Sequence, residues 1–179
     1  MQAIEIITRP FENDAVMKKN LVTIAMGCVA LMMLAGCATT EERAARQAEQ
    51  AMKVEAALNE RCYKINVDRM NPLRGPSRMI SYGYSVEVRN DSLFSYLPYF
   101  GRAYSVPYGG GKALNFSAPI SSYQEFQKKK NLRVIEIGVR NEEDTYLYSL
   151  EVFDNGSSTV RVYARERDRI SFTGEVVFY

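Results

Sequence analysis

The 179-residue sequence contains no histidine and no tryptophan. The absence of histidine excludes a Ser-His-Asp triad, an imidazole general base and every His-ligated metal site. The net charge is also low, because 23 Lys and Arg residues against 21 Asp and Glu residues leave only +2 at pH 7. Proteins that bind nucleic acids concentrate positive charge on one face, so this balance predicts no nucleic-acid partner.

The hydrophobic run near the N-terminus is short for a membrane-spanning segment. Leu21 to Gly36 carries no charged residue and follows Lys18 and Lys19. A spanning helix needs about 20 apolar residues, whereas the core of a signal peptide needs about 7–15. The run ends in Leu34-Ala35-Gly36-Cys37, which resembles the lipobox of bacterial lipoproteins. A signal anchor that happens to end in cysteine is the alternative interpretation.

The lipobox predicts that residues 1–36 are a signal peptide and that Cys37 becomes the acylated first residue of the mature chain. Met17 begins a typical signal-peptide opening, so we expect residues 1–16 to lie upstream of the true start. Several acyl chains on one cysteine anchor a protein stably to a membrane. We therefore expect a lipid-anchored protein of the cell envelope. Ala38 after the cysteine favours the outer membrane, at its periplasmic face or at the cell surface.

The predicted mature chain cannot form an internal disulfide. Cys28 is removed with the signal peptide and Cys37 is acylated, which leaves Cys62 alone. A single thiol cannot form an internal bridge, so the fold depends on its hydrophobic core. Without a histidine partner, Cys62 is predicted to be a buried or half-buried structural thiol.

Residues 37–60 are predicted to form a lipid-anchored tether and a helix. Thr39 and Glu42 have the spacing of a capping box. The stretch that follows, to about residue 60, is rich in Ala, Glu, Gln and Arg, which favour helices. We expect a spacer helix with one weak apolar face, or alternatively a partner-binding coiled coil. The residues of that thin apolar stripe are Ala45, Ala48, Met52 and Ala56.

From residue 61 to residue 179 the hydrophobic period becomes two, which is typical of half-buried strands. Residues 98–112 contain Gly and Pro and are predicted to form a loop, and Ser121–Lys130 a short helix or turn. The short connections between the later runs require antiparallel neighbours. The alternating runs are 63–67, 80–88, 93–97, 113–117, 135–139, 146–152, 160–164 and 170–178.

These runs predict a mainly β domain over residues 61–179, preceded by one N-terminal helix. We expect a single antiparallel, strongly curved sheet of roughly eight strands. Such a sheet either curls into an open or closed barrel or folds into a sandwich.

One segment of this domain carries a family resemblance. Residues 97–104 read Leu-Pro-Tyr-Phe-Gly-Arg-Ala-Tyr. With the other elements given below, this segment resembles domain-of-unknown-function family 4251, a set of small Bacteroidetes envelope lipoproteins. The resemblance implies a β-rich periplasmic or surface lipoprotein and carries over no catalytic residues. The other elements are Asn71-Pro72, Asn90-Asp91, Phe116, Arg167-Asp168-Arg169-Ile170-Ser171-Phe172 and Gly174.

Tyrosine is abundant, with 12 residues, and several tyrosines share the strand parity of the core aliphatic residues. A buried phenol needs a hydrogen-bond partner for its hydroxyl. Such tyrosines either reach the edge of a filled core or line an aromatic pocket for a lipid, sugar or peptide fragment. The candidate pocket residues are Tyr63, Tyr82, Tyr84, Tyr146 and Tyr148.

A second group of aromatic residues crowds the predicted loop. Tyr99, Phe100, Tyr104 and Tyr108 either cover a barrel end or form a partner-binding patch. Ser92, within Asp91-Ser92-Leu93 at a predicted turn, resembles the three-residue acceptor of Bacteroidetes protein O-glycosylation, and we treat it as a candidate modification site.

Catalytic groups are sparse. Strand parity points Glu136 and Glu151 outward, and Asp144 and Asp154 lie in turns, so they are poor candidates for general acids. No Asp or Asn residues have calcium-loop spacing. We expect no enzymatic activity, no cofactor and no metal site. The arginines between residues 161 and 169 form either a solvated face or a surface that attracts anionic headgroups or glycans.

The sequence favours a non-enzymatic binding module for a small amphiphile or another envelope component. The alternative is a structural or assembly lipoprotein that docks a protein partner through its aromatic loop.

Overall fold

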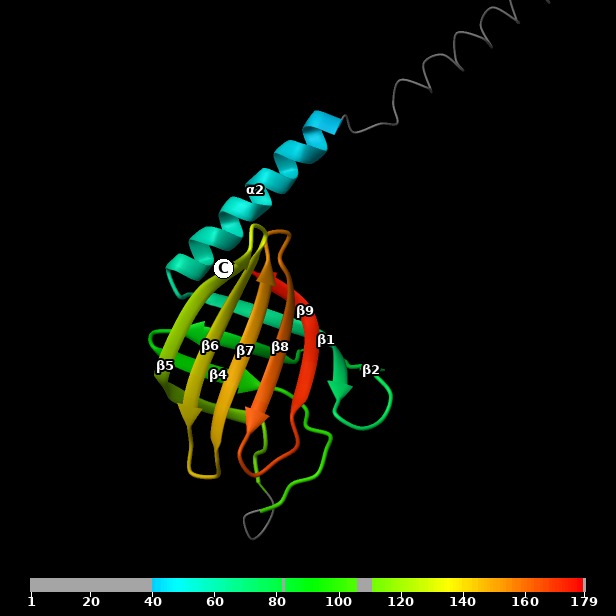
Figure 1. Cartoon of the computed structure of the whole chain (residues 1–179), viewed down its shortest axis with the longest axis vertical. Coiled ribbons are helices and arrows are strands. Elements are labelled where there is room, and N and C mark those ends of the chain that lie inside the picture. Colours follow the sequence, from blue (N-terminus) through cyan, green and yellow to red (C-terminus); the bar gives the residue numbers. More distant parts are fainter. Residues whose placement is uncertain (1–39, 82, 106–110, 179) are drawn as a thin grey trace, which may run out of the picture. The chain divides into compact units, whose positions relative to one another are not determined.

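The computed structural model describes residues 40–81, 83–105 and 111–178 (Figure 1). The predicted signal peptide and Cys37 lie outside these residues. Within the described ranges, the chain has no helix with the length and hydrophobicity needed to cross a bilayer. The elements are α2 (Thr40–Asn59), β1 (Tyr63–Pro72), β2 (Arg78–Met79), β3 (Ser85–Arg89), β4 (Ser92–Tyr96), β5 (Asn115–Lys129), β6 (Leu132–Arg140), β7 (Thr145–Phe153), β8 (Ser157–Ala164) and β9 (Ile170–Val177).

The expected helix is present as α2, but it does not pack through the alanine stripe. Val54 and Leu58, one helical turn apart, are the buried residues of α2, whereas Met52 is 63% exposed. Beside them, the Arg133 guanidinium of β6 lies 2.9 Å from the Glu55 carboxylate of α2. The helix therefore contacts the barrel through its last turns.

The nine described strands form one antiparallel sheet in the order β2-β1-β3-β4-β5-β6-β7-β8-β9, and β1 also pairs with β9. This last pairing closes eight strands, β1 and β3 to β9, into a barrel, and β2 extends the sheet beside β1. The prediction of a mainly β, strongly curved antiparallel sheet is confirmed. Of the arrangements left open by the sequence, the chain adopts the closed barrel.

Closure brings the backbones of β1 and β9 unusually close together at Gly174. A Cβ atom at this position would overlap the carbonyl oxygen of Asn66. Next to this contact, the pairing of β1 with β9 shifts its register between Val67 and Arg69. The absence of a side chain at residue 174 is therefore a condition for closing the barrel at this point.

The prediction of a short helix or turn over Ser121–Lys130 is wrong, because β5 continues to Lys129. Residues 115–119 of this long strand pair with β4, and residues 120–129 pair with β6. The second part of β5 is mostly exposed, so it lacks the apolar alternation that marks a half-buried strand. Backbone hydrogen bonds to β6 hold it extended.

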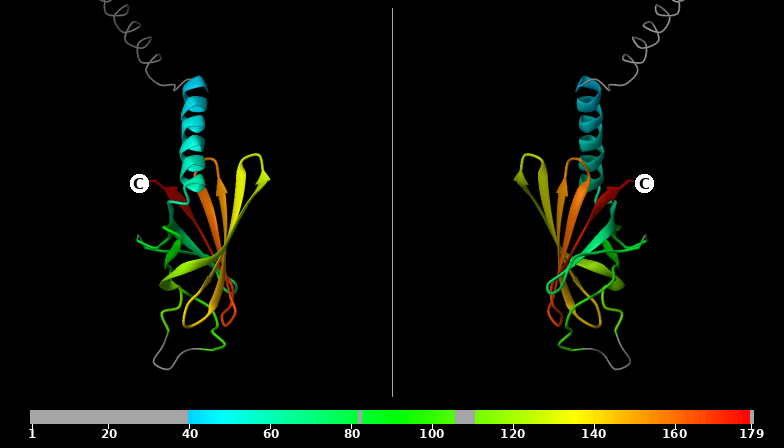
Figure 2. Two further views of the ribbon diagram at one scale, coloured as in Figure 1. Left: turned by 90° about the vertical axis from the view of Figure 1, so that its left-hand side faces the viewer. Right: turned by 90° about the vertical axis from the view of Figure 1, so that its right-hand side faces the viewer.

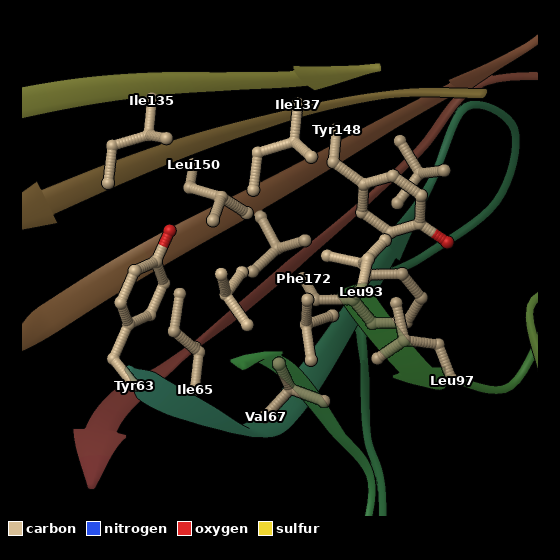
Figure 3. Close-up of a cluster of buried hydrophobic side chains, with 14 of the residues drawn as sticks. Tyr63, Ile65, Val67, Leu93, Leu97, Ile135, Ile137, Tyr148, Leu150 and Phe172 are labelled. Atoms are coloured by element: carbon tan, nitrogen blue, oxygen red, sulfur yellow. The ribbon is translucent and has the colours of Figure 1, made fainter. Parts of the chain in front are cut away.

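The interior of the barrel is filled by side chains from all around the sheet (Figure 3). Ile65, Leu93, Ile137, Leu150 and Phe172 are each completely buried. An eight-stranded barrel is just wide enough either to be filled by side chains or to hold one small ligand. In Figure 2, α2 lies at one end of this barrel and the described residues of the β4–β5 connection lie at the other.

Candidate functional site

Three of the predicted pocket tyrosines belong to the buried core. Tyr63, Tyr146 and Tyr148 are at most 1% exposed. The Tyr148 hydroxyl donates to Ser95 Oγ at 3.0 Å, and Ser95 Oγ donates in turn to a backbone carbonyl of residue 114 at 2.7 Å. The Tyr146 hydroxyl donates to the carbonyl of Ala113 at 3.1 Å. These phenols are therefore part of the packing, and their polar ends have partners.

The hydroxyls of Tyr63 and Tyr123 lie 3.3 Å apart. Burial raises the pKa of Tyr63 and of Tyr148 above the value of about 10 that is usual for a phenol. Removing a phenol from water disfavours its charged form. Both residues therefore remain neutral across the physiological pH range.

The predicted tyrosine cluster is not gathered around one space. Tyr146 and Tyr148 lie 6.4 Å apart between ring centroids and share Phe116 as a neighbour. Figure 3 shows Tyr63 and Tyr148 on opposite sides of the drawn cluster, with aliphatic side chains between them. Tyr84 is half-buried and stacks on Tyr96, with 5.2 Å between the rings. Tyr82 lies outside the described residues.

A groove of about 770 Å³ lies where β3, β4, the start of β5 and the β6–β7 turn meet. We call it the aromatic groove. Phe94 is 36% exposed and Tyr96 49% exposed in its wall, so both offer ring surface. Other residues that line the groove include Glu87, Lys112, Asn115, Phe116, Ser117, Arg140, Glu142 and Glu143.

The charges around the aromatic groove nearly balance. Glu87 pairs with Arg89 at 3.2 Å, and Glu143 pairs with Arg167 at 3.1 Å. The Glu143 carboxylate also accepts a hydrogen bond from the backbone N–H of residue 112 at 2.7 Å. Among the described residues, Arg140 forms no ion pair. Mixed ring faces, amides and balanced charge suit a ligand with an apolar part and an uncharged polar part.

The sequence analysis missed this groove. Phe94 and Tyr96 alternate with the core residues Leu93 and Leu97, so their outward parity was visible. Two aromatic residues on the outer face of one short strand were the available signal. The polar residues of β5 and β6 that complete the groove are distant in the sequence, and the pairings of β4 with β5 and of β5 with β6 bring them close.

The predicted aromatic loop is docked onto the connection between β8 and β9. The Tyr99 hydroxyl donates to the carbonyl of Arg102 at 2.7 Å, and the Tyr104 hydroxyl donates to Asp168 Oδ1 at 2.7 Å. This hydrogen bond from Tyr104 lowers the pKa of Asp168 and raises the pKa of Tyr104. Phe100 is 45% exposed. Tyr108 lies outside the described residues.

Charged groups hold the turns at the same end of the barrel. Asp144 is buried and accepts hydrogen bonds from the backbone N–H groups of residues 145, 165 and 166. The Arg167 guanidinium is also buried and pairs with Glu143. These groups are bound within the protein, which gives them a structural role.

The remaining candidate residues do not line the aromatic groove. Ser92 is half-buried at the start of β4, directly after Asn90 and Asp91, which both have positive φ. It stays a predicted modification site, and Cys62 is a half-buried free thiol. The Glu151 carboxylate is held by Lys128 and Arg161. In the ranges that the structure describes, no three carboxylates or thiols are grouped as metal ligands would be.

Comparisons with known proteins identify the kind of domain. A family model described as "Domain of unknown function (DUF4251)" matches residues 45–176. The crystal structure of a DUF4251 family protein from Bacteroides eggerthii is similar, with a TM-score of 0.55 and 12% identity over 73% of this chain and 91% of that chain. At this identity the likeness concerns the fold. No curated protein matches this chain.

Proposed function

Because this chain belongs to the DUF4251 family, whose description names no function, we propose a role from its own geometry: a lipid-anchored envelope protein that binds a small amphiphile without catalysing a reaction. The observation that carries the proposal is the aromatic groove, in which exposed rings lie beside polar side chains of balanced charge.

The ligand chemistry follows from the residues of the groove. Phe94 and Tyr96 offer flat apolar faces, while Asn115 and Ser117 offer an amide and a hydroxyl. Arg140 and Glu142 carry opposite charges, so a ligand with a net charge gains little binding energy from the groove as a whole. We expect an amphiphile with an uncharged, hydroxyl-rich head, such as a glycoside with an alkyl chain.

The lipid anchor completes the proposal. Acylation of Cys37 would hold the barrel at a membrane surface, with α2 as the spacer. We place the protein in the outer membrane, on its periplasmic face or at the cell surface. Cys37→Ser is expected to keep the full-length precursor mass and to abolish partition into the detergent phase. A variant that is processed and partitions like the wild type would contradict the anchor.

Native mass spectrometry of protein purified from its own host tests the ligand. We expect an adduct on the wild type that is lost in Tyr96→Ala and retained in Phe126→Ala. Phe126 is 46% exposed and lies outside the aromatic groove, which makes it the matched control. No adduct on the wild type, or an equal loss in both variants, would contradict binding in the groove.

A structural role is the second candidate, because apolar surface is exposed around the aromatic loop. Phe100 lies under the Arg78 guanidinium at 4.6 Å. Met79, which follows Arg78 in the chain, is 67% exposed, and Tyr104 is 68% exposed. This surface would dock a protein partner. Cross-linking in cells is then expected to yield one stoichiometric partner, which Phe100→Ala removes and Phe126→Ala retains.

A further inference from the structure

A second groove, of about 390 Å³, crosses the outer face of β1, β9 and β8. We call it the basic groove. Arg161, Ser171 and Asn71 form a row across the three strands, because Ser171 is the register partner of both of the others. Arg169 lies two residues before Ser171 and also lines the groove, together with Leu73.

The charge of the basic groove has one sign. Among the residues that the structure describes, Arg161 and Arg169 are the only charged ones that line it, and no carboxylate does. Arg161 Nη1 lies 2.9 Å from Glu151, but that carboxylate is shared with Lys128 at 3.0 Å. One negative charge thus faces two positive ones. Arg169 is exposed and has no ion pair within the described part of the chain, so an uncompensated positive charge remains.

Apolar surface lies beside these arginines. Leu73 is 44% exposed and Tyr163 is 38% exposed, and both line the basic groove. Ser171 and Asn71 already have partners, because Ser171 Oγ donates to the Asn71 backbone carbonyl at 3.3 Å and Asn71 Nδ2 donates to Thr173 Oγ1 at 3.2 Å. The donors open to a ligand are therefore the guanidinium groups. Their planar forks match the oxygens of a phosphate and bind them with two parallel hydrogen bonds.

We propose that the basic groove binds a phosphate ester, with Arg169 and Arg161 on the phosphate and with Leu73 and Tyr163 against its apolar substituent. The phosphate belongs either to a lipid headgroup or to a soluble compound. The proposal does not depend on the aromatic groove, whose charges balance. It also assigns different chemistry to two faces of one barrel.

The test uses the full chain in dodecyl maltoside micelles, which carry no phosphate, and two soluble probes. Inorganic phosphate represents the bare anion, and dihexanoyl phosphatidylglycerol, kept below micelle formation, represents a lipid headgroup. Binding is followed by the NMR signals of the arginine Nε–H groups. Saturable binding of phosphate alone would identify a soluble phosphate source, and stronger binding of the phosphatidylglycerol would identify a headgroup site. Saturable binding of neither probe would overturn the proposal.

Variants localise the binding. The double variant with Arg161→Gln and Arg169→Gln is expected to bind the probe at least about tenfold more weakly. This factor matches the loss of one charge-assisted hydrogen bond. Arg165→Gln is the matched control, because its side chain is 82% exposed and lies outside the groove. Thermal unfolding confirms that each variant is folded. Equal weakening per removed charge in the double variant and in the control would also overturn the proposal, because it would indicate general charge attraction.

Discussion

The tyrosines inside the barrel and the aromatic residues of the aromatic groove share their chemistry and differ in environment. Tyr148 is completely buried and its hydroxyl donates to Ser95. Tyr96 is 49% exposed, and Phe94 beside it is 36% exposed. The interior rings fill the space that a ligand would need, whereas the outer rings are partly open to solvent. The interior therefore serves stability, and the wall is where we propose that the ligand binds.

The largest effect is expected from Tyr148→Ala, which would empty part of the interior. Replacing a buried aromatic residue by alanine costs about 3–5 kcal/mol of folding free energy. Urea unfolding measures this loss. The exposed control Phe126→Ala should change the free energy of unfolding by no more than about 0.5 kcal/mol. Equal unfolding midpoints for the two variants would contradict the claim that the interior rings, and not the outer ones, stabilise the fold.

Alkaline pH tests the burial of the interior tyrosines without a mutation. The pKa values of Tyr63 and Tyr148 are raised in the folded protein, so the unfolded chain releases these protons first. The stabilisation that comes from keeping these phenols neutral is therefore complete below about pH 10. As the pH rises above this value, the free energy of unfolding falls by about 1.4 kcal/mol per pH unit for each tyrosine. Urea unfolding across this range measures the slope.

The variant Tyr148→Phe serves as the control for this slope. It keeps the ring but removes one ionisable hydroxyl, so the alkaline slope should fall by about 1.4 kcal/mol per pH unit, the share of one tyrosine. A free energy of unfolding that stays constant above pH 10 would show that the interior phenols ionise in the folded state.

A smaller and local effect is expected at the aromatic loop. Asp168→Asn weakens the bond from the Tyr104 hydroxyl, so the loop should open more often while the barrel stays closed. Amide hydrogen exchange should accelerate at Tyr104, whose N–H donates to the Glu166 carbonyl at 2.8 Å, and should be unchanged in β7. Unchanged exchange at Tyr104 would contradict the docking role of Asp168.

Acid is expected to have the same effect as that substitution. The pKa of Asp168 is lowered, chiefly by the hydrogen bond from Tyr104. The docking contribution is therefore present above the ordinary aspartate pKa of about 3.9 and is lost as the pH falls below it. The protection factor of the Tyr104 amide, the intrinsic exchange rate divided by the observed rate at each pH, should fall on acidification in the wild type and stay constant in Asp168→Asn.

The smallest change in stability is expected from Tyr96→Ala in the groove wall. Its ring stacks on Tyr84, so its removal should cost about 0.5–1.5 kcal/mol. Urea unfolding of the variant tests this expectation. A loss as large as that of Tyr148→Ala would mean that Tyr96 is a structural residue.

The sequence predicted the local features of the fold well. Alternating residues gave the strands, and short turns such as Asn155-Gly156 required antiparallel neighbours, as β7 and β8 are. Barrel closure was not predictable, because the pairing of Ile65 with Val176 joins strands from the two ends of the domain. The extended second part of β5 was missed because pairing with β6, and not apolar alternation, maintains it.

The candidate site was harder to predict for the same reason. Strand parity placed Tyr148 inside correctly, but the partner of its hydroxyl, Ser95, lies on another strand 53 residues away. Parity alone cannot decide whether an interior phenol is satisfied by a protein partner or by a ligand. The aromatic groove also depends on residues from four strands, so its shape emerges only after folding.

The central claim is that the wall of the barrel binds the ligand and the filled interior does not. NMR of the full chain in nanodiscs, titrated with octyl glucoside below micelle formation, tests it directly. Binding in the wall predicts saturable shifts at Phe94, Tyr96 and Asn115 and unchanged signals from Tyr63 and Tyr148. Shifts concentrated at Tyr63 and Tyr148 would show that the ligand enters the barrel and would contradict binding in the wall.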